Sequence, residues 1–199
     1  DNNIKYLSYF QVDNPMVKIA DPYFIGYHIS QKSEVSSKVI PKKFPEEKLG
    51  IICRYSGKNT IIEYSDLTEK DMYDRDKNGN LTYLMGSIAI HIFNVDFLIH
   101  SSAKLPYHFA VKTVKGYQFD SDKTSEINEF KGLKFEHFVF DVIPMTEISA
   151  FFETIRDEEF FPLKNKTGDD SIDTCIKGQS SLHLSWLNGI KELKDGYKG

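Results

Sequence analysis

The chain has 199 residues and a mass of 23.0 kDa, the size of one domain or of a domain with an appendage. Hydrophobic residues make up 40% of it and charged residues 27%, a composition that is typical of a globular protein and excludes a disordered one. The formal net charge of -4 argues against a nucleic-acid partner, because proteins that bind phosphate backbones are usually basic. No apolar run reaches the roughly 18 residues of a membrane span and no signal peptide is visible, so we expect no membrane partner.

The two cysteines, Cys53 and Cys175, lie far apart in the sequence and match no zinc-binding spacing. Unpaired thiols are typical of a reducing compartment, so we expect a cytoplasmic protein. The chain opens at Asp1, inside a stretch whose pattern already indicates structure. We therefore expect it to be a piece of something longer.

The first half of the chain is predicted to hold a strand, a helix and a hairpin. Residues 5–12 (KYLSYFQV) are aromatic and roughly alternating, which favours a strand. Asp21 and Pro22 are typical of an N-cap and a first helical turn, so a helix is expected to begin there. Whether Asp21 also binds a ligand is left open, with the capping role favoured. Residues 50–64 predict two strands joined by a turn over residues 56–59.

The second half is predicted to continue this mixture of helices and strands. Residues 86–98 are apolar enough to be buried, but their period does not decide between helix and strand. Residues 135–144 and 150–154 predict two buried strands, and the chain from residue 170 onward favours a helix with a polar tail over 194–199. The pattern predicts a mixed-sheet α/β domain over residues 1–169, followed by a helical segment over 170–199.

Two features that suggest metal binding have simpler interpretations. Residues 74–82 (DRDKNGNLT) match the opening of an EF-hand calcium loop, but Met85 stands where the bidentate glutamate should be. We therefore favour a solvated Asn-Gly turn. Isolated histidines on apolar segments, such as His91 and His137, are more often core residues than metal ligands.

Three charged residues are candidates for contact with a ligand. Lys164 follows a charged segment whose aromatic residues would pack and could aim the lysine into a cleft. Glu63 ends a predicted hairpin strand, and Asp13 follows a predicted strand, where ligands of open α/β sheets collect. From the local sequence alone, an ordinary surface charge is the more common case for Lys164 and Glu63, and the position of Asp13 is suggestive but not specific.

Four segments together resemble the motifs of the eukaryotic-type UDP-N-acetylglucosamine pyrophosphorylase family, in the same order and spacing. The resemblance covers most of residues 10–165 and implies the second half of a catalytic domain with the mixed-sheet, Rossmann-like nucleotide-diphospho-sugar transferase fold. The segments are FQVDNPMVKIADPYFIGY at 10–27, LGIICRYSGKNTIIEYSDL at 49–67, GLKFEHFVFDV at 132–142 and RDEEFFPLKN at 156–165.

The resemblance implies an enzyme that makes UDP-N-acetylglucosamine and pyrophosphate from UTP and N-acetylglucosamine-1-phosphate, with Mg²⁺ as cofactor. Matched by motif, Asp13 would hold the metal, and Gly50 and Glu63 would contact the sugar. Lys134 and Lys164 match lysines that face the phosphates and would be the catalytic residues. These roles suit phosphoryl-type transfer, which needs positioning and charge neutralisation more than a protein nucleophile.

One departure from the family concerns the sugar. The family sequence G-N-I-A-N-H is replaced by GSIAIH at residues 86–91, so Ser87 stands where the family has an asparagine that contacts the sugar. Ser87 is too short to make the same contact. A pyrophosphorylase for another UDP-sugar, such as UDP-glucose or UDP-galactose, therefore stays an alternative. So does a non-catalytic domain that binds sugar nucleotides.

A second departure concerns the uridine. The family carries a Gly-rich loop of the L-G-G-G-x-G-T-x-L type, whose backbone amides face the nucleotide phosphates, and these 199 residues hold no such loop. We therefore expect the chain to supply the sugar and phosphate side of the site, to need the N-terminal half of the same enzyme as its partner, and to be inactive alone.

Overall fold

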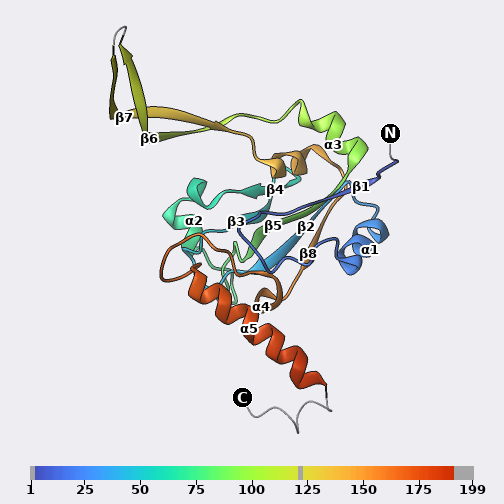
Figure 1. Cartoon of the computed structure of the whole chain (residues 1–199). Coiled ribbons are helices and arrows are strands. Elements are labelled where there is room, and N and C mark those ends of the chain that lie inside the picture. Colours follow the sequence, from blue (N-terminus) through green and yellow to red (C-terminus); the bar gives the residue numbers. More distant parts are fainter. Residues whose placement is uncertain (1–2, 121–122, 191–199) are drawn as a thin grey trace.

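The computed structural model describes residues 3–120 and 123–190 (Figure 1). Its centre is a six-stranded mixed sheet in the order β4-β3-β5-β2-β8, with β1 also paired to β5. The β2–β8 pair is parallel and the other pairs are antiparallel. The strands of this sheet are β1 (Tyr6–Tyr9), β2 (Val35–Pro41), β3 (Gly50–Tyr55), β4 (Lys58–Ile62), β5 (Met85–Asn94) and β8 (Ser149–Glu153).

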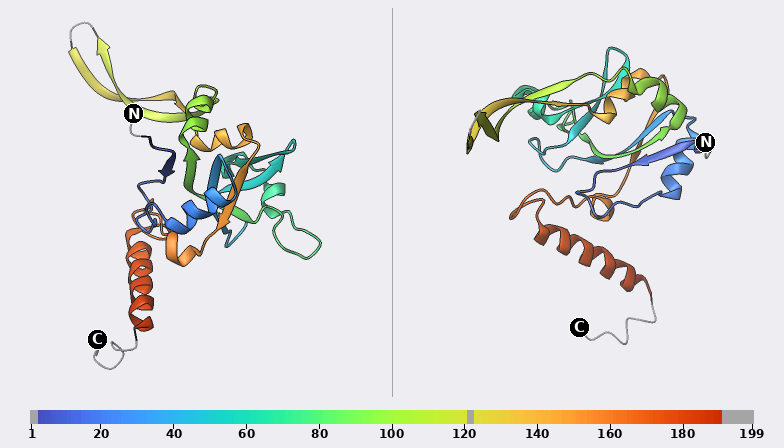
Figure 2. Two further views of the ribbon diagram at one scale, coloured as in Figure 1. Left: turned by 90° about the vertical axis from the view of Figure 1, so that its right-hand side faces the viewer. Right: turned by 45° about the horizontal axis from the view of Figure 1, so that its top comes forward.

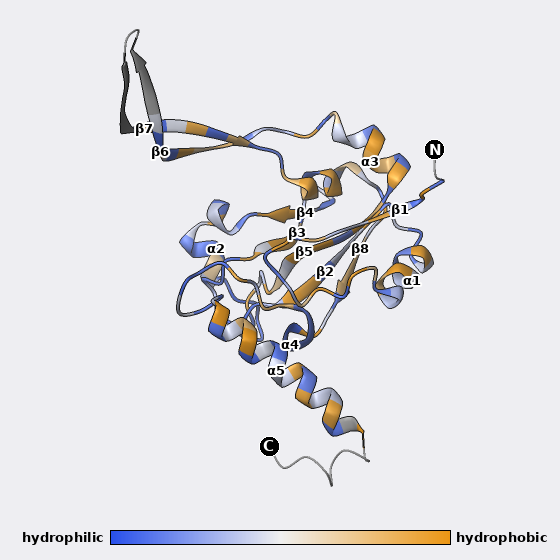
Figure 3. Cartoon of the chain, viewed as in Figure 1, coloured by the Kyte–Doolittle hydropathy of each residue, from blue (hydrophilic) through white to orange (hydrophobic). Residues whose placement is uncertain are grey.

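Two apolar clusters pack on the sheet. Side chains of β5 alternate between them, because neighbouring residues of a strand point to opposite faces: Ile92 belongs to the first cluster and Phe93 to the second. The first cluster includes Phe24 of helix α1 (Pro22–Ser30), and the second includes Val142 of the 3-10 helix η2 (Val139–Met145). Figure 3 shows the hydrophobic residues concentrated on the central strands.

Two elements project from this body, as Figures 1 and 2 show. One is a long two-stranded ribbon of β6 (His108–Asp120) and β7 (Lys123–Glu136), and the other is helix α5 (Ile172–Gly189). No helix in the described part of the chain combines the length and the apolar character needed to cross a bilayer. The remaining elements are η1 (Tyr64–Asp66), α2 (Glu69–Tyr73), α3 (Val95–Ser102) and α4 (Arg156–Glu159).

Most elements expected from local signals are confirmed. Strand β1 is shorter than the predicted residues 5–12, and helix α1 begins where expected. Helix α5 accounts for the predicted C-terminal helix. The predicted polar tail over 194–199 lies outside the described residues. The hairpin turn is tighter than predicted: it holds only Ser56 and Gly57, both with positive φ, as a two-residue hairpin requires. Residues 86–98 divide between β5 and α3, with Asn94 as the N-cap of α3.

The buried strand predicted over residues 135–144 is wrong. Strand β7 ends at Glu136, and the apolar run continues as η2, which buries Val142 and Ile143. Pro144 lies within that run and has no backbone N–H to offer a strand ladder. The strand predicted over 150–154 is confirmed as β8, whereas β2 and β6 were not predicted.

Candidate functional site

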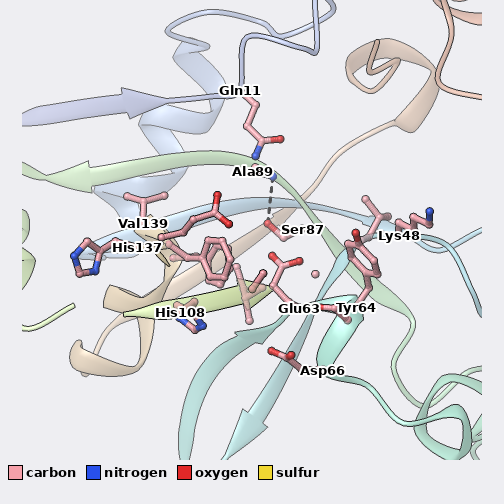
Figure 4. Close-up of a pocket in the computed structure, with 18 of the residues that line it drawn as sticks. Gln11, Lys48, Glu63, Tyr64, Asp66, Ser87, Ala89, His108, His137 and Val139 are labelled. Atoms are coloured by element: carbon pink, nitrogen blue, oxygen red, sulfur yellow. Dashed lines mark hydrogen bonds between the residues drawn. The ribbon is translucent and has the colours of Figure 1, made fainter. Parts of the chain in front are cut away.

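A cavity of about 710 Å³ lies between strands of the central sheet and the base of the β6–β7 ribbon, and Figure 4 shows residues that line it. Its walls come from β1, β3, β4, β5, the ribbon, η2 and the segment after α4. These elements are far apart in the sequence, and the fold brings them to one place. Five of the six residues singled out in the sequence line it: Gly50, Glu63, Ser87, Lys134 and Lys164.

Three of these five come from adjacent strands. Gly50 begins β3 and pairs with Ser87 of β5, while Glu63 directly follows the last residue of β4, the other neighbour of β3. A Cβ atom on Gly50 would lie 2.8 Å from Cγ2 of Ile61 and 3.4 Å from Oε1 of Glu63. Glycine is therefore the residue that fits here without displacing its neighbours.

The carboxyl group of Glu63 has an unusual electrostatic environment. Burial raises its pKa, and the nearby carboxylate of Asp66 raises it further, while the ammonium group of Lys164 acts in the opposite direction. Burial also limits hydration, which leaves the Glu63 oxygens available to a ligand. A carboxylate in this setting can accept charge-assisted hydrogen bonds from hydroxyl groups.

Strand β5 bulges where it passes the cavity. Ser37 of β2 pairs with His91, and the pairing resumes at Val39 and Ser87, so one residue of β2 stands opposite three of β5. At the centre of the bulge Ala89 has a φ of 55°, and its N–H donates to Ser87 Oγ at 3.3 Å (Figure 4). A bulge changes the direction of side chains, and here Ser87, Ala89 and His91 all line the cavity.

The two lysines reach the cavity from separate elements. Lys134 is on β7, half-exposed, with its Nζ 2.6 Å from Oε1 of Glu136. Lys164 is exposed on the segment after α4, and its backbone N–H donates to Asp170 O at 2.7 Å. Two ammonium groups on the wall of one cavity can neutralise an anionic ligand.

Asp13 does not line the cavity, but it is tied to the segment that carries Lys164: its carbonyl accepts a hydrogen bond of 2.7 Å from the N–H of Leu163. Its Oδ1 is buried and has no hydrogen-bond partner in the described structure. An unpartnered carboxylate oxygen suits Mg²⁺, which often binds one or two carboxylates together with substrate phosphates. The described residues hold no group of three or more His, Cys, Asp or Glu that could bind a metal. Water or ligand oxygens would therefore have to supply the rest of the coordination of a metal at Asp13.

Residues 2–172 match the family described as UTP–glucose-1-phosphate uridylyltransferase. The chain belongs to this family.

Its relatives agree with the predicted resemblance to UDP-N-acetylglucosamine pyrophosphorylases. It is 37% identical over 190 residues to UDP-N-acetylhexosamine pyrophosphorylase-like protein 1 of Xenopus tropicalis, covering 92% of this chain and 37% of that protein. It is 34% identical over 202 residues to UDP-N-acetylglucosamine pyrophosphorylase of Saccharomyces cerevisiae, covering 97% of this chain and 42% of that protein. The crystal structure of the Trypanosoma brucei UDP-N-acetylglucosamine pyrophosphorylase matches with a TM-score of 0.79 at 26% identity, over 92% of this chain and 36% of that one. The mixed-sheet α/β fold is thereby confirmed, and the chain spans less than half of each of these three proteins.

Asp21, whose role the sequence left open, has two partners in the structure. Its Oδ1 accepts a hydrogen bond of 3.0 Å from the N–H of Tyr23, which confirms the N-cap, and its Oδ2 lies 2.6 Å from Nζ of Lys38. Asp21 is not among the residues that line the cavity. Both contacts stabilise the fold, and neither reaches the cavity.

Several residues of the cavity were missed in the sequence. The rings of Phe138 and Phe140 are stacked with centroids 5.0 Å apart, and His108 Nε2 lies 2.7 Å from Oδ2 of Asp141. Both phenylalanines lie within residues 135–144, for which the sequence predicts a buried strand and no role in a site. Other polar cavity residues missed in the sequence include Gln11, Lys48, Tyr64 and Asp66 (Figure 4).

Neither feature that suggested metal binding in the sequence forms a metal site in the described residues. Asp76 is exposed and accepts hydrogen bonds from the N–H groups of Asn78 and Asn80 at 2.8 and 3.0 Å, which confirms a turn in residues 74–82. His91 is fully buried, as predicted, and burial lowers its pKa to about 4. The expectation that His137 is a core residue is wrong, because it is exposed just beyond the end of β7, where its Nδ1 donates to Pro106 O at 2.8 Å.

Proposed function

We propose that this chain forms the sugar and phosphate side of the active site of a UDP-sugar pyrophosphorylase. The reaction would be the Mg²⁺-dependent synthesis of UDP-N-acetylglucosamine and pyrophosphate from UTP and N-acetylglucosamine-1-phosphate. One observation carries the proposal: Glu63, a carboxylate that could bind sugar hydroxyl groups, lines the same cavity as Lys134 and Lys164, although the three residues come from distant parts of the chain.

In the proposed step an oxygen of the sugar phosphate forms a bond to the α-phosphorus of UTP. The bond from that phosphorus to the bridging oxygen breaks, and pyrophosphate leaves with the electron pair. Lys134 and Lys164 would neutralise the negative charge of the phosphates, and Glu63 would orient the sugar through its hydroxyl groups. Gly50 would keep space for the sugar beside Glu63, because any side chain there would enter that space.

Asp13 would hold Mg²⁺ through its unpartnered Oδ1. Mg²⁺, when bound, would supply additional charge neutralisation to the phosphates. The chain's own contribution is to hold this carboxylate beside the segment that carries Lys164. Transfer of this kind depends mainly on positioning and charge, so no protein nucleophile is needed.

Ser87 favours a second candidate within the same class. It lines the cavity, and its Oγ accepts the hydrogen bond from Ala89, so the hydroxyl is partly engaged within the protein. A site with this shorter side chain could serve UDP-glucose or UDP-galactose in place of UDP-N-acetylglucosamine. Sugar selectivity therefore has to be measured directly.

The decisive experiment is pyrophosphorolysis by the full-length gene product, with UDP-N-acetylglucosamine and UDP-glucose side by side. Lys164→Ala should abolish turnover, whereas Lys166→Ala, which removes an exposed lysine that does not line the cavity, should not. Turnover of UDP-glucose alone would favour the second candidate and implicate Ser87. Absence of turnover with either sugar, or equal turnover after Lys164→Ala, would favour a non-catalytic domain that binds sugar nucleotides.

We further propose that the chain is inactive alone, since it offers no Gly-rich loop for the uridine phosphates, and that the N-terminal half of the enzyme completes the site. The 199-residue chain should show no pyrophosphorolysis under conditions in which the full-length protein is active. A cytoplasmic location is proposed as well, because Cys53 and Cys175 are both free thiols.

A further inference from the structure

Two segments that are about 145 residues apart in sequence lie side by side next to the cavity. Asn14 Nδ2 donates to Glu159 O at 2.7 Å, and Asn14 Oδ1 accepts from the N–H of Phe161 at 3.2 Å. One residue earlier, Asp13 O accepts from the N–H of Leu163 at 2.7 Å. The three bonds engage every second residue of the segment from 159 to 163, as in a short strand pairing.

The amide of Asn14 suits this position better than other side chains do. It is 5% exposed and bonds a carbonyl and an N–H at the same time, which an amide can do because it carries both a donor and an acceptor. A carboxylate of the same shape would keep the acceptor but would place a negative charge against the carbonyl of Glu159. An alanine would leave both backbone groups without their partner.

The partner segment is itself anchored to the centre of the sheet. Glu159 is 2% exposed, and its Oε2 lies 2.5 Å from Nζ of Lys38 on β2. Thr154 Oγ1, just beyond β8, donates to Glu159 Oε1 at 2.6 Å. The Glu159 carbonyl that accepts the Asn14 hydrogen bond is therefore fixed relative to the sheet, and Asn14 is fixed with it.

We propose that Asn14 is a positioning residue that holds the carboxylate of Asp13 in register with the ammonium group of Lys164. The proposal rests on the proposed function, in which Asp13 holds the metal and Lys164 faces the phosphates. Asp13 directly precedes Asn14, and Lys164 directly follows the residue bonded to Asp13. Loss of the Asn14 bonds frees both groups to move relative to each other, and displacements of about 1 Å can cost about 100-fold in rate.

The test uses Asn14→Ala in the full-length protein, with Asn94→Ala as the matched control. Asn94 also makes a side-chain hydrogen bond, with its Oδ1 3.1 Å from His28 Nε2, and it does not line the cavity. Three quantities are measured: the melting temperature, kcat and KM for pyrophosphorolysis of the preferred UDP-sugar, and the binding of Mn²⁺ to the complex with that UDP-sugar by electron paramagnetic resonance. The last does not depend on turnover.

Asn14→Ala should lower kcat by about 100-fold with KM for the UDP-sugar changed by no more than about twofold, and should weaken Mn²⁺ binding. Asn94→Ala should lower the melting temperature without either effect. The proposal is overturned if Asn14→Ala only lowers the melting temperature, as the control does. A wild-type protein without turnover would instead refute the proposed function, and unchanged Mn²⁺ binding in Asn14→Ala would then refute the positioning role separately.

Discussion

The Nζ of Lys38 lies 2.5 Å from Oε2 of Glu159, and both side chains are almost completely buried. Lys38 stands in the middle of β2, and its second partner is Oδ2 of Asp21 at 2.6 Å. The rings of Phe24 and Phe152 lie 5.3 and 5.9 Å from the same ammonium group. One buried cation thus ties together the start of α1, the centre of the sheet and the segment that leads to Lys164.

Lys38→Met should be strongly destabilising. It would leave Asp21 and Glu159 as buried carboxylates without a counter-charge, and breaking such a pair from one side typically costs about 3–5 kcal/mol. Lys58→Met removes an ion pair with Glu147 whose side chains are 39% and 85% exposed, so it should cost no more than about 1 kcal/mol. Urea unfolding of the two variants gives both values, and similar losses would contradict the importance of the buried pair.

The stability that Lys38 contributes should also depend on pH. Burial by itself would raise the pKa of Asp21, but the Lys38 ammonium group and the N–H groups of Tyr23 and Phe24 outweigh it and lower that pKa. A carboxyl with a lowered pKa stabilises the fold above its unfolded pKa of about 3.9 and loses this effect as the pH falls through the folded value. Without Lys38, burial would raise the pKa of Asp21, and the unfolded chains titrate alike. The difference in unfolding free energy between wild type and Lys38→Met should therefore shrink as the pH falls from the raised pKa of the variant to the lowered pKa of the wild type, which urea unfolding at several pH values measures.

The contrast between the hairpin and β2 shows what the sequence could predict. The β3–β4 hairpin has its signal in a few adjacent residues, apolar strands around Ser56 and Gly57, so it was predicted. Strand β2 has Ser36, Ser37 and Lys38 at its centre, which is a polar pattern. Ser37 and Lys38 bond His91 and Glu159, which are 54 and 121 residues away, and Ser36 bonds His28 of helix α1. The residues of the strand itself do not reveal these partners.

The same distinction applies to the candidate site. The resemblance to a family assigns roles to Gly50, Glu63 and Lys164, and this predicts them as site residues. Phe138 also lies in a matched segment, residues 132–142, but the resemblance assigns no role to it. Phe138 and His108 belong to the cavity because a 3-10 helix and the base of the ribbon fold over it. Neither placement follows from the residues next to them, since it depends on tertiary structure.

Gly50→Ala should impair both stability and function. The new Cβ would meet Ile61 Cγ2 at 2.8 Å and Glu63 Oε1 at 3.4 Å, so one of these neighbours must shift. Overpacking of this kind costs about 1–3 kcal/mol, and a shift of Glu63 should lower kcat/KM for the sugar substrate. Gly26→Ala is the control: it lies in helix α1 with nothing within 4 Å of its Cβ position. It should raise stability by about 0.5–1 kcal/mol and leave kcat/KM unchanged.

Glu63→Gln should separate stability from activity. Burial raises the pKa of Glu63, so this carboxyl favours the folded state at low pH and the benefit is lost as the pH rises through the raised value. The glutamine variant carries no such titration. It should be more stable than wild type at pH 7, should lose this advantage below the ordinary glutamate pKa of about 4.3, and should bind the sugar substrate poorly. Thermal unfolding across pH and kcat/KM measure the two effects, and a variant that is less stable at pH 7 would contradict the assignment.

Gly178→Ala tests how firmly helix α5 is attached and whether the predicted boundary between residues 169 and 170 has physical meaning. A Cβ on Gly178 would lie 2.5 Å from two ring carbons of Phe161, whose N–H is bonded to Asn14. If α5 unfolds together with the sheet, this overpacking should cost about 1–3 kcal/mol, although alanine is the better helix former by about 1 kcal/mol.

Ser180→Ala, at an exposed position of the same helix, should change stability by less than about 0.5 kcal/mol and serves as the control. A Gly178→Ala protein that is as stable as wild type in urea would mean that α5 is not held against Phe161 in solution. Residues 170–199 would then be a separate segment. We expect the opposite, because Phe161 lies between α5 on one side and the Asn14 bonds on the other, so a displaced ring would disturb the segment that carries Lys164.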